Sequence, residues 1–173
     1  MIKPQIAVIG SGLLLENQKE YSLAKELGEG LIDKGYRILC GGLGGVMTAV
    51  CEGAKTSPNY SEGSTIGILP TLDRDLVNPF IDICIATGLS MARNQVIIAS
   101  SEIVIAIGGG AGTLSELAFA WQLNKPIITL RDTGGWSSKL SDQKIDDSRI
   151  DTINSVDKVS EVLELISTIL EEK

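Results

Sequence analysis

The chain contains no histidine among its 173 residues. A Ser-His or Cys-His nucleophile pair, a zinc site with imidazole ligands and the usual general base at neutral pH all require that residue. Any chemistry must therefore use carboxylates, arginine, lysine, hydroxyl or thiol groups, or backbone amides.

Aromatic residues are also scarce, at 4% of a chain that is 43% hydrophobic. A core with so few rings must be aliphatic, which suits an α/β protein. The three cysteines, Cys40, Cys51 and Cys84, form no C-x-x-C pair, and their odd number argues against a disulfide framework or a thiolate metal site. Each lies in an apolar run, so we expect buried free thiols, no metal site and a reducing, cytoplasmic location.

Long apolar runs are missing too, since none approaches the ~18 residues that a membrane span requires. The first residues, Met1 to Pro4, lead directly into an apolar strand and leave no room for a secretion signal. The 15 Lys and Arg are outnumbered by 22 Asp and Glu, giving a formal net charge of −7. Because nucleic-acid affinity comes mainly from cations that neutralise phosphates, we expect no nucleic-acid partner. Because no apolar run is long enough, we expect no membrane partner either.

Short aliphatic runs alternate with helical patterns along the whole chain, which predicts one domain over residues 1–173. The predicted strands cover residues 5–9, 36–40, 65–69, 81–86, 103–107 and 127–130. The predicted helices cover residues 23–34, 46–55, 91–100, 113–123 and 156–170, and residues 131–152 are predicted to be irregular. Strands joined by helices favour an α/β fold with a doubly wound, mostly parallel sheet, covered by helices on both faces.

Glycine is abundant, at 19 residues, and it clusters where predicted strands end. Such clusters let backbone N–H groups and a helix N-terminus approach an anion, so three of them on one sheet edge predict a phosphate-binding site. Tight turns with no ligand are the structural alternative. The candidate binding residues in these clusters are Gly10, Ser11, Gly12, Gly41, Gly42, Gly44, Gly45, Val46, Met47, Gly108, Gly109, Gly110, Gly112 and Thr113.

The familiar nucleotide-binding fingerprints are absent from these clusters. No Gly-Lys-Ser/Thr and no G-x-G-x-x-G occurs, and Cys40-Gly41 ends a strand where a dinucleotide-binding protein needs an acidic residue. A ligand of mononucleotide size is therefore favoured over NAD or ATP. No lysine lies in a recognisable Schiff-base context, so pyridoxal phosphate is not expected either.

Two charged residues accompany the glycine clusters. Arg93 begins a predicted helix after the fourth strand, where a guanidinium can pair with phosphate or orient a carboxylate; an exposed arginine at a helix start is the alternative. Glu116 follows the third cluster. Thr113-Leu114-Ser115-Glu116 matches a capping box, so spacing alone favours a helix cap over a ligand or catalytic role for Glu116.

Three segments together resemble the LOG family: Gly-Gly-x-Gly-Gly-Val-Met at 41–47, Arg93-Asn94, and Gly-Gly-x-Gly-Thr-x-x-Glu at 109–116. The resemblance extends from the first strand to about Leu130. It implies a Rossmann-like fold and a phosphoribohydrolase that activates cytokinin nucleotides, a type of enzyme often mislabelled "lysine decarboxylase". It also adds Asn94 to the candidate binding residues.

The chain departs from the LOG hydrolases at several positions. Gly108 replaces the proline of their second loop, Asn94 replaces a lysine, and Met91 lies one residue closer to the arginine. The segment 131–136 resembles instead a sister branch that includes the molybdenum cofactor carrier proteins. That resemblance implies molybdopterin held by the phosphate loops, without turnover, and molybdoenzymes or cofactor-insertion proteins as recipients.

Two hypotheses of function follow. In the first, which we favour, the glycine loops and Arg93 hold the phosphate of the molybdenum cofactor. In the second, Arg93 and Glu116 act as catalytic residues of a nucleoside 5′-monophosphate phosphoribohydrolase, since carboxylate chemistry needs no histidine. A loop at Gly134-Gly135 would close over a flat ligand, with Trp136 in the core or an interface as the alternative.

The resemblance further implies a homodimer or homotetramer. We expect the aliphatic face of the predicted helix 91–100 to form the contact.

Overall fold

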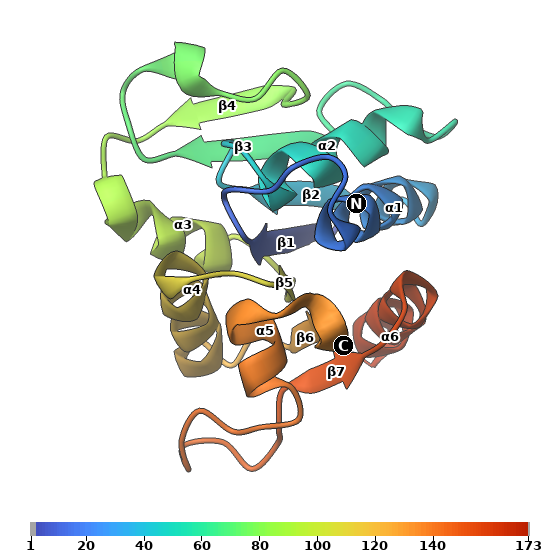
Figure 1. Ribbon diagram of the computed structural model, residues 1–173, viewed down its shortest axis with the longest axis vertical. Helices are drawn as coiled ribbons and strands as arrows, with labels where there is room; N and C mark the ends of the chain where they lie inside the picture. Colours follow the sequence, from blue (N-terminus) through green and yellow to red (C-terminus); the bar gives the residue numbers. More distant parts are fainter. Residues whose placement is uncertain (1–2, 173) are drawn as a thin grey trace.

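The structure, a computed structural model, describes residues 3–172. Over that range the chain forms a seven-stranded sheet in the order β4-β3-β2-β1-β5-β6-β7, with every pair of neighbours parallel (Figure 1). The strands are β1 (Gln5–Gly10), β2 (Arg37–Cys40), β3 (Thr65–Leu69), β4 (Ile83–Ala86), β5 (Ile103–Ile107), β6 (Ile127–Leu130) and β7 (Asn154–Val156). The α/β fold class, with its doubly wound parallel sheet, is confirmed.

Helices cover both faces of this sheet. The α-helices are α1 (Lys19–Asp33), α2 (Val46–Thr56), α3 (Arg93–Ala99), α4 (Ala111–Gln122), α5 (Gly135–Leu140) and α6 (Val159–Glu171), and short 3-10 turns are η1 (Arg74–Leu76), η2 (Ser90–Ala92) and η3 (Arg131–Thr133). Figure 1 shows α1, α2 and α6 on one face and α3, α4 and α5 on the other. No helix among residues 3–172 is long and apolar enough to cross a membrane.

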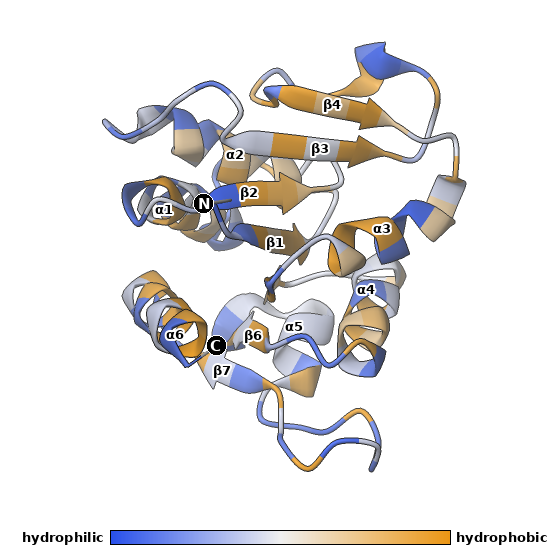
Figure 2. Cartoon of the chain, turned by 180° about the vertical axis from the view of Figure 1, so that it is seen from behind, coloured by the Kyte–Doolittle hydropathy of each residue, from blue (hydrophilic) through white to orange (hydrophobic). Residues whose placement is uncertain are grey.

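The central strands are apolar on both sides because each face is covered. Along β5, Ile103, Ile105 and Ile107 pack with α1, α2 and α6 residues, whereas Val104 and Ala106 pack with those of α3 and α4. Side chains of a strand alternate between faces, so a strand buried on both sides reads as a continuous aliphatic run. Figure 2 shows this apolar colouring along the inner strands β1 and β2.

The sheet changes winding direction between β1 and β5. The chain leaves β1 toward α1 on one face and leaves β5 toward α4 on the other, although the two strands are neighbours in the sheet. Loops that diverge in this way open a crevice at the carboxyl ends of the strands. The predicted glycine clusters after β1, β2 and β5 all lie at this edge.

Two elements near the C-terminus differ from the sequence prediction. Residues 131–152, expected to be irregular, contain η3 and α5, and Val156 belongs to β7 rather than to the last helix, which begins at Val159. Tertiary hydrogen bonds explain α5, because the Ser137 hydroxyl donates to the carbonyl groups of Ala106 and Leu130, at 2.9 and 3.0 Å. A six-residue helix anchored by such long-range bonds shows no periodicity of its own.

Two further expectations need correction, and the one about the helix 91–100 is refined. The fourth helix begins at Ala111 with Gly110 as its cap residue and no side-chain cap bond, so Thr113 and Glu116 form no capping box. Ile97 and Ile98 of α3 are fully buried inside the molecule, while Met91, Ala92 and Ala99 of the predicted helix 91–100 are exposed, so a contact between copies there stays a prediction. Cys84, expected in the core, lies on the edge strand β4 and is partly exposed.

Cys40 and Cys51 are buried, as expected. Residues 1, 2 and 173 lie outside the described residues. The two ends of the expected domain and the first residues of the segment expected to contain no secretion signal are among them.

Candidate functional site

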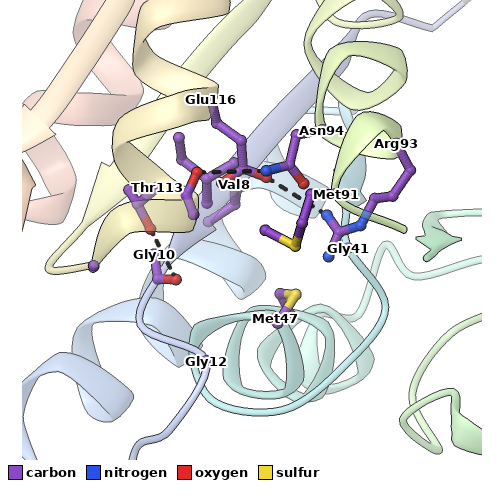
Figure 3. Close-up of a pocket in the computed structure, with 13 residues that line it drawn as sticks. Val8, Gly10, Gly12, Gly41, Met47, Met91, Arg93, Asn94, Thr113 and Glu116 are labelled. Atoms are coloured by element: carbon purple, nitrogen blue, oxygen red, sulfur yellow. Dashed lines mark hydrogen bonds and ion pairs between the residues drawn. The ribbon is translucent and has the colours of Figure 1, made fainter. Parts of the chain in front are cut away.

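A cleft of about 260 Å³ opens at the carboxyl end of the sheet, at the divergence of β1 and β5 (Figure 3). The residues that form its wall are Val8, Ile9, Gly10, Gly12, Gly41, Met47, Met91, Arg93, Asn94, Gly110, Gly112, Thr113 and Glu116. Except for Val8, Ile9 and Met91, each of these was a candidate binding residue in the sequence. Val8 and Ile9 were overlooked because the pattern assigns them only to a buried strand.

The first turn of α4 forms one wall of the cleft. Leu114 makes the first backbone bond of this turn, donating its N–H to the Gly110 carbonyl at 3.0 Å. The preceding N–H groups, at residues 111–113, have no carbonyl of the same helix to bind. Gly110 and Gly112 also lack a Cβ that would cover the backbone, so this turn offers the amides and helix dipole that bind anions.

The loop before α4 is fixed by two hydroxyl groups. Gly108 and Gly109 adopt φ angles of +63° and +97°, which favour glycine. The N–H of Gly108 donates to Thr133 Oγ1 and that of Gly109 to Ser11 Oγ, each at 2.9 Å. These amides are therefore occupied, and the structure places Ser11, Gly108 and Gly109 behind the cleft wall, where they hold the loop in position.

The loop after β2 packs against the loop after β1. A Cβ on Gly45 would lie 2.1 Å from the Ser11 carbonyl oxygen, and the Val46 N–H donates to the same oxygen at 2.9 Å. From this loop and the start of α2, only Gly41 and Met47 reach the wall of the cleft. The remaining candidates in it, Gly42, Gly44, Gly45 and Val46, lie outside the wall.

Arg93 is a buried cation beside the cleft, with 9% of its surface exposed. Its guanidinium lies against Gly41, where an added Cβ would be 2.5 Å from both Nη atoms. Nη1 is 3.5 Å from Glu116 Oε1, and Nε is buried with no hydrogen-bond partner among the described residues. Burial lowers the pKa of Arg93, and Glu116 opposes that change. The alternative of an exposed arginine is wrong.

Glu116 reaches the cleft from the second turn of α4 and is 7% exposed. Burial raises the pKa of this carboxyl group from 4.5 to about 7, although Arg93 pulls it down. The group therefore changes its charge near neutral pH. Such a carboxyl group can donate or accept a proton at the cleft, which the capping-box pattern did not indicate.

Two polar side chains in the wall connect its elements. Asn94 Nδ2 on α3 donates to Ser115 Oγ at 2.9 Å, and Thr113 Oγ1 on α4 donates to the Gly10 carbonyl at 3.1 Å. Asn94 thus ties α3 to α4, and Thr113 ties α4 to the end of β1. Both side chains orient the wall in addition to facing the cleft.

The segment around Trp136 supports the loop from behind. A Cβ on Gly135 would lie 2.3 Å from the Gly109 carbonyl oxygen, and the Trp136 N–H donates to that oxygen at 3.0 Å. The Trp136 ring packs on the core of the α3–α5 face, with Lys139 Nζ 4.7 Å from its centroid. Trp136 is absent from the cleft wall, so its place in the core agrees with the structural alternative.

Comparisons with known proteins agree with this architecture. The model of the SLOG cluster4 family matches residues 3–163. The molybdenum cofactor binding protein of Rippkaea orientalis is 37% identical, with a TM-score of 0.85 over 98% of this chain and 99% of that protein. The molybdenum cofactor carrier protein of Chlamydomonas reinhardtii is 31% identical, with a TM-score of 0.80 over 98% of this chain and 99% of that protein.

A hydrolase is also similar over part of the chain. The cytokinin riboside 5′-monophosphate phosphoribohydrolase of Mycobacterium tuberculosis is 31% identical over 122 residues, which is 65% of this chain and 63% of that protein. The similarity to the two cofactor-binding proteins thus extends over almost the whole chain, whereas that to the hydrolase covers about two thirds.

Proposed function

The chain belongs to the SLOG cluster4 family, and we propose that it is a carrier and storage protein for the molybdenum cofactor, which it holds without turnover. One observation carries the proposal: the first turn of α4, open at Gly110 and Gly112, faces a cleft that also contains Arg93. Amides at a helix start together with a guanidinium suit a phosphate group. The phosphate of molybdopterin would bind there.

The residues of the cleft fit a phosphate-bearing cofactor. The buried Nε of Arg93 is a hydrogen-bond donor with no partner among the described residues, and a buried donor of this kind is costly unless something accepts its bond. The glycines of the α4 turn leave the backbone accessible. A bound phosphate would accept hydrogen bonds from the amides of this turn and be attracted by the guanidinium, while the cofactor itself would supply the metal and dithiolene chemistry to a recipient molybdoenzyme or cofactor-insertion protein.

The carrier proposal is tested by what copurifies with the protein. Expressed in a host that makes the cofactor, the wild-type chain should retain pterin, detected by fluorescence after oxidation, together with molybdenum, detected by mass spectrometry. Arg93→Met should lose both. Arg37→Met removes the same charge at the amino end of β2, opposite the cleft, and should retain both. A wild-type protein that carries no pterin would contradict the proposal.

A second candidate is a nucleoside 5′-monophosphate phosphoribohydrolase, which the position and pKa of Glu116 favour. The pKa of this carboxyl group is about 7, so its ionised form can take a proton from the water whose oxygen bonds to the sugar carbon. The bond from that carbon to the base breaks, and the base leaves with the electron pair and takes up the proton. Release of free base and ribose 5-phosphate from AMP, abolished by Glu116→Gln, would establish this activity and overturn storage without turnover.

A further inference from the structure

Two methionines line the cleft from different elements. Met47 belongs to the first turn of α2 and Met91 to η2, and both thioethers point into the cleft (Figure 3). The chain has only three methionines, so the two within residues 3–172 are both at this site. Among the described residues that form the wall, none is aromatic.

Core packing explains Met47 only in part and does not explain Met91. Met47 is partly buried and packs against the core of the α1 and α2 face. Met91 is 63% exposed, so packing within the described residues covers only part of its side chain. Because both thioethers face the cleft, they form an apolar part of its wall that a ligand in the cleft would contact.

The polar and apolar parts of the cleft adjoin each other. The Cε atom of Met91 lies 3.7 Å from the position that a Cβ on Gly112 would occupy. The methyl end of Met91 is therefore next to the turn of α4 proposed to hold the phosphate. A ligand anchored there by its phosphate would extend its remaining part between Met91 and Met47.

The chemistry of thioethers indicates which group this part contains. Methionine is flexible and polarisable, makes favourable contacts with aromatic rings and adapts to rings of different shape. Such contacts replace the aromatic stacking that the wall lacks. The thioether pair is thus suited to a flat heteroaromatic ring, either a pterin or a nucleobase.

We propose that Met47 and Met91 hold the flat heteroaromatic ring of the ligand between their thioether groups and determine which rings the site accepts. This inference rests on one part of the proposed function, namely that the phosphate of the ligand binds at the first turn of α4. The two methionines are specificity residues for the ring, whereas backbone N–H groups of α4 and the Arg93 guanidinium contact the phosphate.

The test compares two phosphate esters that differ in the ring. Formycin 5′-monophosphate carries a purine-like ring on a carbon–carbon bond that glycosidic hydrolysis cannot cleave, whereas ribose 5-phosphate has no ring. The measured quantity is the ratio of their dissociation constants by calorimetry. Truncating one methionine should reduce the preference for the ring-bearing ester by about 2- to 12-fold. Met91→Ala and the Met47→Ala/Met91→Ala pair should weaken the binding of formycin 5′-monophosphate more than the binding of ribose 5-phosphate.

Controls separate a ring contact from a loss of structure. Met91→Leu keeps the apolar volume and should restore part of the preference, and Ile150→Ala, at a residue 97% exposed and outside the cleft wall, should leave the ratio unchanged. Because Met91 is mostly exposed, Met91→Ala tests the inference even if Met47→Ala fails to fold.

The two proposals fail in different ways. If ribose 5-phosphate binds but Met91→Ala leaves the ratio unchanged, the methionine inference is overturned and the phosphate site stands. If neither ester binds the wild-type protein, the phosphate site fails and the inference fails with it.

Discussion

At the scale of single residues, Arg93 and Glu116 set the charge of the cleft. The guanidinium is held between Gly41 and the Glu116 carboxylate, 3.5 Å away, and both charged groups are largely buried. When Glu116 is ionised the pair is neutral, and when it is protonated Arg93 is free to attract an anion. The charge offered to a phosphate therefore depends on one proton.

This dependence predicts how anion binding responds to pH. The pKa of Glu116 is raised from 4.5 to about 7, so the carboxyl group is mostly neutral at about pH 6 and mostly ionised at about pH 8. The affinity for inorganic sulfate, which stays a dianion throughout, should fall as the pH rises through 7, by at most about tenfold per pH unit because one proton is lost. Calorimetric titrations across this range measure the slope. Glu116→Gln should abolish it, and an unchanged slope in that variant would contradict the assignment.

Gly41 predicts a second residue-scale effect. In Gly41→Ala the new methyl group would lie 2.5 Å from both Nη atoms and must displace the guanidinium. Binding of ribose 5-phosphate should weaken by about tenfold or more, as expected when a charge-assisted contact worth roughly 1.5–3 kcal/mol is lost. If the loss acts through Arg93, the double variant Gly41→Ala/Arg93→Met should bind no more weakly than Arg93→Met alone. Additive losses in this cycle would show that Gly41 acts independently.

At the scale of elements, the loop between β5 and α4 is held by hydroxyl groups from two distant segments. Ser11 follows β1 and Thr133 ends η3, and each accepts a loop N–H at 2.9 Å. Thr133 Oγ1 also donates to the Leu130 carbonyl at 2.7 Å. These bonds fix the start of α4, and the direction of its free amides follows from them.

Thr133→Val tests this support, because valine has the same shape but cannot accept the bond. The buried Gly108 N–H would lose its partner, which should lower the free energy of unfolding by about 1 to 3 kcal/mol. Urea denaturation measures the change. Thr168→Val, on the exposed part of α6, should stay within about 0.5 kcal/mol of the wild type. Equal effects of the two substitutions would contradict a special role for Thr133.

The sequence predicted six of these strands and the long helices because their apolar patterns are local and strong. It missed β7, where Asn154-Ser155-Val156 has little apolar pattern, and Val156 stands at helical spacing from Val159. It also placed a capping box at Thr113 to Glu116. That local motif is present, but α4 begins two residues earlier, and Glu116 instead pairs with Arg93, 23 residues away in the chain. The spacing of residues within one segment cannot predict a contact between two segments that are distant in the sequence.

At the scale of the whole molecule, the glycine loops meet because the sheet is wound in two directions from β1 and β5. The sequence located these loops but not the cleft between them, since Met91 comes from a turn that is distant in sequence from each cluster. The chain carries a net charge of −7, yet the cleft combines a helix N-terminus with a guanidinium. Local fields of this kind bind an anion in spite of the overall charge.

Self-association is the prediction that concerns the molecule as a whole. The family resemblance in the sequence implies two or four copies, and light scattering should give a mass of two or four times 18.4 kDa. Ile97 and Ile98 of α3 are buried in the core, so a contact through the predicted helix 91–100 would use its exposed residues, such as Ala99. A single species of 18.4 kDa at micromolar concentration would contradict the prediction.

A crystal structure with ribose 5-phosphate tests the central claim most directly. The account predicts that the phosphate lies at the first turn of α4, within hydrogen-bond distance of the N–H groups of Gly112 and Thr113, with Arg93 facing the same cleft. A phosphate bound elsewhere on the molecule, or an empty α4 turn at a saturating ligand concentration, would contradict it.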